Sequence, residues 1–312
     1  MDSFLMAGQV ILPLLILMLL GVFLRKTGLM DVATYKKLNT LIFKVFLPPL
    51  IFYNVYKSEL EVAFDGKLIL FSVLSVLALF FVLVLLVPML EKDNKRRGAI
   101  IQGIFRSNFV IFGVPLTTAL MGDAAAGKVA VVVAFVVPLF NFLAVISLEV
   151  FRHGKPDIKK ILKGIVTNPL ILASLLGILT TAIGLKLPRV LETAVSDVAK
   201  IATPLALIVL GASLDFELLK ANSIRVLLVT AARLVFVPLV FLGIAILLGF
   251  RGVDIAILLS VFASPTAVSS YAMAQQMGAD DALAGQIVAS TTAFCVFTVF
   301  LFVFGMDLIG VL

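Results

Sequence analysis

The sequence has few charged residues for its length. Of its 312 residues only 14% are charged and 62% are hydrophobic, and the mean hydropathy is +1.20. Soluble domains carry about 25% charged and roughly 45–50% apolar residues, so a soluble fold of this size would lack polar residues for its surface. The apolar runs are continuous over about twenty residues rather than alternating. We therefore expect an all-α integral membrane protein.

Cysteine and histidine are almost absent. Cys295 is the only cysteine and His153 is the only histidine. One cysteine cannot form an intramolecular disulfide bond, and these two residues supply too few ligands for a zinc site. A serine–histidine–acid triad inside the membrane needs a histidine that the apolar runs do not contain. We expect no metal, no cofactor and no enzymatic activity.

Ten apolar segments follow one another along the chain, joined by short connections. They cover residues 5–24, 34–56, 68–90, 98–121, 127–150, 161–184, 190–214, 223–248, 253–276 and 283–308. A run of about twenty apolar residues is long enough to cross the hydrocarbon core of a bilayer. The sequence therefore predicts ten transmembrane helices and no separate soluble domain.

The basic residues predict the orientation of these helices. The net charge of +7 does not indicate a nucleic-acid partner, because excess lysine and arginine in membrane proteins mark cytoplasmic loops. Most of them fall in alternate connections, among them Lys36, Lys37, Arg96, Arg97 and the linker 151–160. We expect that side to be cytoplasmic, with both termini outside the cell inner (plasma) membrane.

Ten spans divide into two units of five, and an odd number of crossings inverts the second unit. Weak sequence similarity supports such a duplication, since Phe105–Asn108 corresponds to Phe262–Pro265 and Met121-Gly122 to Met277-Gly278. The sequence therefore predicts a first five-helix repeat in residues 1–150, a cytoplasmic linker at 151–160 and a second, inverted repeat in 161–312.

The fourth and ninth segments have polar residues and proline at mid-depth. Proline breaks or kinks a helix, and backbone groups freed in this way must be buried in protein or line a watery cavity. Paired interrupted helices in two halves of a repeat indicate a binding site near the middle of the membrane. The candidate substrate-binding residues are Arg106, Ser107, Asn108, Gly113, Pro115, Ser264, Pro265 and Thr266.

The chemistry of these residues favours an anion. The N-termini of half-helices carry partial positive charge, and Arg106 adds a full charge at a depth where burying it is costly. Structural roles stay open beside this one: Arg106 can reach the membrane edge, and Ser264 and Thr266 can satisfy the broken backbone. Asn141 is expected to form helix-to-helix hydrogen bonds.

Three further groups of charged residues have structural interpretations. Asp197 and Lys200 lie three residues apart and can form an ion pair, although a titratable site for proton coupling stays open. Lys44 and Arg233 have no obvious partner, and we expect their charged ends to reach the membrane surface.

The sequence resembles the auxin efflux carrier family in its bacterial form, which is related to plant PIN-type auxin transporters. The resemblance covers nearly the whole chain and is carried by LNTLIFKVFLPPLIF in the second span, SNFVIFGVPL in the fourth, PLALIVLGASL in the seventh and SPTAVSSYAMAQQMG in the ninth. It implies ten helices in two inverted repeats, with broken helices four and nine crossing at the substrate site. The resemblance implies one asparagine in each broken helix. This chain has Asn108 in the first but no asparagine beside Pro265 in the second.

The resemblance also implies a function and a mechanism. Spans one, two, six and seven would form a scaffold, and the remaining spans would move as an elevator. Members of the family export or exchange organic anions such as auxin, malate or malonate, and PIN-type carriers form homodimers. The alternative is a sodium- or proton-coupled organic-anion symporter of the bile-acid-transporter type. The sequence does not decide the anion, the direction of transport or the coupling ion.

Overall fold

The computed structural model describes residues 2–57, 65–122, 125–152, 158–214 and 222–312. This part of the chain is almost entirely helical and contains no strand, which confirms the all-α prediction. The helices are α1 (Asp2–Lys26), α2 (Val32–Leu41), η1 (Ile42–Phe46), α3 (Leu47–Tyr56), α4 (Gly66–Leu90), α5 (Asn94–Phe105), η2 (Phe109–Gly113), α6 (Val114–Met121), α7 (Ala126–Arg152), α8 (Ile158–Val166), α9 (Pro169–Ala182), α10 (Arg189–Ser213), α12 (Ser223–Ala231), η4 (Ala232–Phe236), α13 (Val237–Leu247), α14 (Val253–Ala263), α15 (Ser269–Met277) and α16 (Asp281–Leu308).

Within the described residues, 6 helical stretches are long and apolar enough to cross a membrane. They are Val32–Tyr56, Gly66–Leu90, Gly127–Arg152, Arg189–Ser213, Ser223–Leu247 and Asp281–Leu308. Shorter apolar helices cover Phe109–Met121, Pro169–Ala182 and Val253–Ala263. These lengths support a multi-pass helical membrane protein, whereas the ten predicted crossings and their inverted arrangement remain a prediction.

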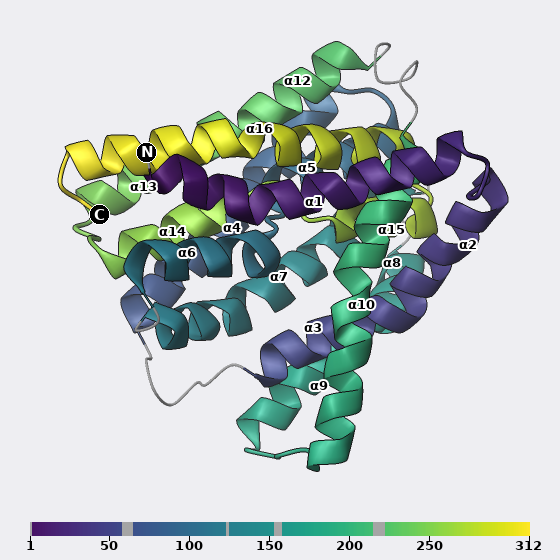
Figure 1. The fold of residues 1–312 in the computed structure, drawn as a ribbon, viewed down its shortest axis with the longest axis horizontal. Coiled ribbons are helices and arrows are strands. Elements are labelled where there is room, and N and C mark those ends of the chain that lie inside the picture. Colours follow the sequence, from purple (N-terminus) through teal and green to yellow (C-terminus); the bar gives the residue numbers. More distant parts are fainter. Residues whose placement is uncertain (1, 58–64, 123–124, 153–157, 215–221) are drawn as a thin grey trace.

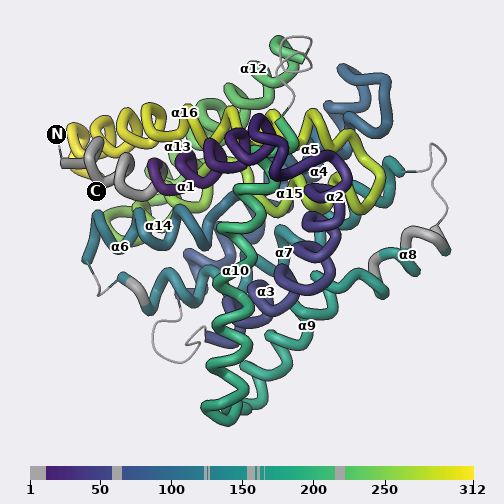
Figure 2. Tube along the Cα trace, turned by 45° about the vertical axis from the view of Figure 1, so that its right-hand side comes forward, coloured from purple at the N-terminus to yellow at the C-terminus, as the bar shows by residue number. Residues whose placement is uncertain are grey.

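The packing of the helices divides most of them into two groups, which also contact each other, as α1 does with α16 and α3 with α7. In one group α10 packs against α1 and α3, and α3 packs against α9; Figures 1 and 2 show α3, α9 and the first half of α10 projecting from the rest of the molecule. The other group contains α4, α5 and α7 together with α6 and α12 to α16. The first turns of α1 lie at the same end of the molecule as the C-terminus (Figure 1).

The sixth predicted segment, 161–184, is not one continuous helix. It contains the end of α8 and all of α9, which has 14 residues. The side chain of Asn168 accepts a hydrogen bond of 2.9 Å from the amide of Leu170 and so caps α9. Pro169 has no amide hydrogen and fits the first helical position, so the Asn-Pro pair starts a new helix there. Residues 153–157 of the predicted linker, including His153, lie outside the described part.

In the described part of the chain, three helices contain a π-helical segment shortly before a proline. Pro48 follows η1, Pro115 follows η2 and Pro238 follows η4. Proline cannot donate to the carbonyl one turn earlier and its ring crowds that turn, which is a physical reason for the local widening. Such segments are frequent at functional sites, and η2 and η4 both lie next to the interruption described below.

The helices of the fourth and ninth predicted segments are each interrupted, and these two interruptions pair with each other. Helix α5 ends at Phe105 before η2 begins at Phe109, and α14 ends at Ala263 before α15 begins at Ser269. The Asn108 amide donates to the Pro265 carbonyl over 2.8 Å, and the Ala267 amide donates to the Arg106 carbonyl over 3.1 Å. Ser107 thus lies opposite Thr266 in a short antiparallel bridge. We call this paired region, residues 106–108 and 264–268, the crossing.

Side chains of the crossing satisfy the backbone groups that the interruptions leave free. The Thr266 hydroxyl donates to the Gly103 carbonyl over 2.6 Å, and the Thr266 amide donates to the Thr291 hydroxyl over 3.1 Å. The Ser264 hydroxyl donates to the carbonyl of Ser260 one turn earlier. All of these residues are buried, so each bond replaces one that water cannot make.

The substitution Thr266→Val tests this role. Valine has nearly the same shape but leaves the buried Gly103 carbonyl without its donor, which costs about 1–3 kcal/mol. We expect the melting temperature of the purified protein to fall by several degrees. The control Thr298→Val removes a 3.3 Å bond within one helix at a partly exposed position and should leave it nearly unchanged. An equal effect of both substitutions would contradict the assigned role.

Candidate functional site

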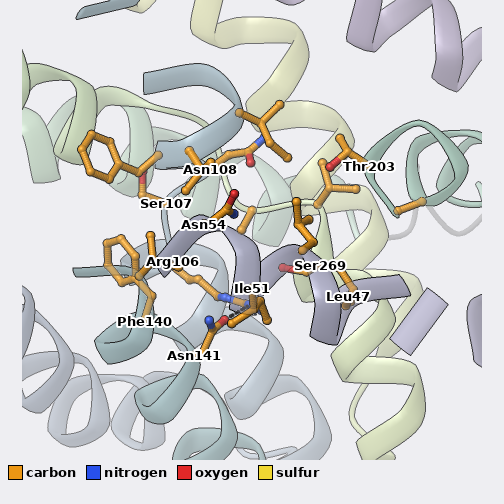
Figure 3. Close-up of a pocket in the computed structure, with 18 residues that line it drawn as sticks. Leu47, Ile51, Asn54, Arg106, Ser107, Asn108, Phe140, Asn141, Thr203 and Ser269 are labelled. Carbon is orange, nitrogen blue, oxygen red and sulfur yellow. Dashed lines mark hydrogen bonds between the residues drawn. The ribbon is translucent and has the colours of Figure 1, made fainter. Parts of the chain in front are cut away.

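A cavity of about 70 Å³ lies beside the crossing. Its wall comes from α3, α7, α10, η2, both segments of the crossing and the first turn of α15 (Figure 3). It therefore lies between the two helix groups, and both groups contribute residues to its wall. Its polar lining residues are Asn54, Arg106, Ser107, Asn108, Asn141, Thr203 and Ser269.

Arg106 is a buried cation whose described partners are neutral. Its side chain lies in the cavity wall and points toward Asn141 (Figure 3). Arg106 Nη2 donates to Asn141 Oδ1 over 2.6 Å, and Nη1 donates to the sulfur of Met273 over 2.6 Å. None of the ion pairs in the described part of the chain includes Arg106. A buried charge without a counter-charge is strongly destabilising, so an anion in this cavity would relieve a cost that the free protein bears.

Three hydrogen-bond donors around Arg106 have no partner among the described residues. The Arg106 guanidinium can only donate, which fixes the Asn141 amide with its oxygen toward Arg106 and leaves Asn141 Nδ2 without a bond. Asn108 Nδ2 and the Ser107 hydroxyl also lack a partner. Each unsatisfied buried group costs about 1–3 kcal/mol. All three residues line the cavity, so they are candidate donors to a ligand with several acceptor oxygens.

The backbone adds to the positive character of the cavity. Helix α15 begins with Ser269 and η2 begins with Phe109, and both residues line the wall. The N-terminal turn of a helix carries partial positive charge and free amide donors. Among the described residues no aspartate or glutamate lines the cavity. Arginine, amide donors, a hydroxyl and two helix N-termini together are suited to a carboxylate.

The predicted site residues fall into two sets. Arg106, Ser107 and Asn108 line the cavity. Ser264, Pro265 and Thr266 are buried in the second segment of the crossing and do not line it. For these residues, contact with a substrate remains a prediction, and the observed bonds of the two hydroxyl groups are to the protein backbone.

Gly113 and Pro115 lie further along the same broken helix and also stay outside the cavity wall. A Cβ atom on Gly113 would lie 2.9 Å from the Ser260 carbonyl oxygen, so glycine allows η2 to approach α14. Pro115 is exposed and lies directly after η2, where its missing amide hydrogen and its ring account for the π-helical widening described above. Both residues shape the broken helix.

The sequence did not single out several cavity residues. Asn54 and Thr203 come from α3 and α10, far along the chain from the crossing. Asn141 was expected to form a helix-to-helix bond, and it does so with Arg106 while also lining the cavity. A single asparagine in an otherwise apolar helix is the signal that could have identified Asn54 and Asn141.

The structure tests the interpretations of the Asp197–Lys200 pair and of Arg233. Asp197 and Lys200 form the expected ion pair, with 3.0 Å between the charged atoms, at an exposed position. The expectation that the charged end of Arg233 reaches the membrane surface is wrong. Arg233 is fully buried and donates to three backbone carbonyls, because η4 packs against both α5 and α14.

Known proteins that are similar in sequence to this chain are described as membrane transporters. Residues 7–160 and 155–303 match the family described as membrane transport protein. An uncharacterized transporter of Methanothermobacter thermautotrophicus is 24% identical over 93% of this chain and 95% of its own length. An uncharacterized transporter of Methanocaldococcus jannaschii is 24% identical over 92% and 94%, and a proposed malonate transporter of Rhizobium meliloti is 27% identical over 84% of each chain. Because the family match spans nearly all of the sequence, the protein belongs to the auxin efflux carrier-like family of membrane transport proteins and is not an enzyme.

Proposed function

We propose that the protein is a secondary transporter of small organic anions and that the cavity beside the crossing is its binding site. The observation that carries this proposal is the buried Arg106, which has no acidic partner among the described residues and is surrounded by unpartnered donors. The Rhizobium meliloti relative, described as a proposed malonate transporter, supports a carboxylate as the substrate class.

In this proposal one carboxylate of the substrate binds the Arg106 guanidinium. Asn108 Nδ2, Asn141 Nδ2 and the Ser107 hydroxyl are available to donate to the remaining oxygens. The apolar wall from α3, with Leu47, Leu50 and Ile51, accommodates the carbon skeleton. A dicarboxylate and an aromatic acid both fit this chemistry, and both belong in the binding assay.

The proposed architecture has ten transmembrane helices in two inverted repeats, residues 1–150 and 161–312. The family match divides into two segments that meet near residues 155–160, close to the expected linker. Gly122 and Gly278 end α6 and α15 with positive φ angles of 78° and 75°, so both interrupted helices stop on a glycine at corresponding positions. The antiparallel pairing of the two interruptions is also what a twofold axis through the crossing requires.

The proposed mechanism is an elevator motion of one helix group against the other. The group that contains α1, α3, α9 and α10 is the scaffold, and the group with the crossing moves. Because the cavity wall contains residues of both groups, such motion would open it to alternate sides of the membrane. Assembly as a homodimer is part of the proposal and rests on the family resemblance alone.

Binding is tested by the melting temperature of the purified protein with malonate, malate, acetate and indole-3-acetate. A ligand that binds only the folded state raises stability by mass action, so we expect at least one carboxylate to raise the melting temperature in proportion to the logarithm of its concentration. Arg106→Gln should abolish the shift, because the charge is lost. Asn141→Asp should abolish it as well, because its carboxylate would pair with Arg106.

The control for this assay is Arg189→Gln, which removes an exposed arginine outside the cavity and should keep the full shift. If the Arg106→Gln protein folds and still responds to the same carboxylate as the wild type, the proposed site is wrong. If none of the four acids shifts the wild type, the proposed substrate class is wrong.

The orientation is tested by cysteine labelling in spheroplasts. Cys295 is fully buried and gives little background, so single exposed cysteines can be read directly. We expect a membrane-impermeant maleimide to label Lys186→Cys in intact spheroplasts and to label Lys36→Cys only after permeabilisation, with both termini outside the plasma membrane. The reverse pattern would invert the proposed topology.

A further inference from the structure

Arg233 binds the ends of both interrupted helices. It lies in η4 and is fully buried. Its Nε donates to the Ser264 carbonyl over 2.9 Å, Nη1 donates to the Ile104 carbonyl over 3.1 Å and Nη2 donates to the Val261 carbonyl over 3.2 Å. One guanidinium group thus uses three nitrogens to hold the end of α5 and the end of α14 together.

A cation beside these carbonyls stabilises them, because their partial negative charges are buried. The last carbonyls of a helix have no partner within the helix and carry partial negative charge. Here two such ends meet inside the protein, where water cannot compensate them. In carriers with broken helices, half-helix C-termini and unwound carbonyls coordinate monovalent cations. None of the ion pairs in the described part of the chain includes Arg233, so the carbonyls are its observed partners.

We propose that Arg233 is a built-in cation that takes the place of a dissociable monovalent cation at the crossing. It acts as a positioning residue, because it holds the two helix ends and does not line the anion cavity. Anion binding then needs no sodium, since the positive charge that stabilises the crossing is covalently attached. The inference concerns coupling and so rests on the proposed function, but its main test needs no substrate.

The geometry explains why the residue is arginine. The guanidinium is planar and presents five donors in a fixed fork, whereas the ammonium of lysine is a single compact charge. Three carbonyls from two helices are each reached by a different nitrogen of Arg233. Removing this side chain leaves carbonyl oxygens around a space of guanidinium size, which is a binding site for a soluble cation.

The main test measures the melting temperature of Arg233→Ala in choline buffer with added guanidinium or sodium at low millimolar concentration. We expect a much lower melting temperature than in the wild type and a saturable recovery of about 5 °C or more with guanidinium or sodium. The wild type should shift by less than about 1 °C. If the variant is folded and neither cation raises its melting temperature, the proposal is overturned.

The matched control is Arg251→Ala. Arg251 also donates to backbone carbonyls, those of Ile246 and Phe250 at 2.9 and 2.7 Å, but it is exposed in the connection between α13 and α14. We expect no cation response from this variant. An equal response from both variants would show a general salt effect and would overturn the proposal.

Two further measurements keep the inference testable. If Arg233→Ala does not fold in choline, recovery of folded protein only with guanidinium or sodium supports the proposal, and failure with both contradicts it. In the wild type, malonate affinity should agree within about twofold in sodium and choline buffers, because no cation has to bind first. If malonate binding to the wild type required sodium, the inference would be overturned. If malonate did not bind in either buffer, the proposed substrate would be wrong, and the Arg233→Ala result would decide the inference.

Discussion

The structure depends on how two interrupted helices satisfy their own backbone inside a membrane. A helix broken at mid-depth frees amides and carbonyls that cannot reach water. Here the two breaks satisfy each other: the segments 106–108 and 264–268 pair, and hydroxyl groups of Ser264 and Thr266 donate to carbonyls of α14 and α5. Pro265 lies in the second break and its carbonyl accepts from Asn108, and Gly113 allows η2 to approach α14.

The two interruptions create two different electrostatic environments close to each other, one rich in carbonyl oxygens and one rich in hydrogen-bond donors. The C-terminal ends of α5 and α14 present carbonyls, and Arg233 binds them. The cavity presents the opposite character, since it contains Arg106, unpartnered amide groups and the first turn of α15. Arg233 thus donates to three backbone carbonyls, whereas Arg106 donates to one amide oxygen and one thioether sulfur and lines a cavity. This difference favours a structural role for Arg233 and a binding role for Arg106.

The sequence predicted the all-α membrane class and an interruption in each of the fourth and ninth segments, because proline and polar residues at mid-depth are incompatible with a continuous lipid-facing helix. Pro265 lies in the second interruption, whereas the first lies at residues 106–108 and Pro115 follows it within the helical stretch Phe109–Met121. It could not give the pairing of Ser107 with Thr266, since that depends on how helices from the two halves meet. Asn54 and Thr203 were missed for the same reason. Arg233 was misjudged because nothing near it in sequence is acidic, and its backbone partners become visible only in three dimensions. The start of α9 at Asn168-Pro169 was missed because hydropathy outweighed the capping signal.

The most direct test of the central claim is a pair of experimental structures, determined with and without saturating malonate. We predict one difference density peak in the cavity, in contact with the Arg106 guanidinium and within hydrogen-bond distance of Asn108 and Asn141, with Arg233 still bound to the three carbonyls. Density for the anion elsewhere, with Arg106 still bound only to Asn141 and Met273, would contradict the proposed binding site.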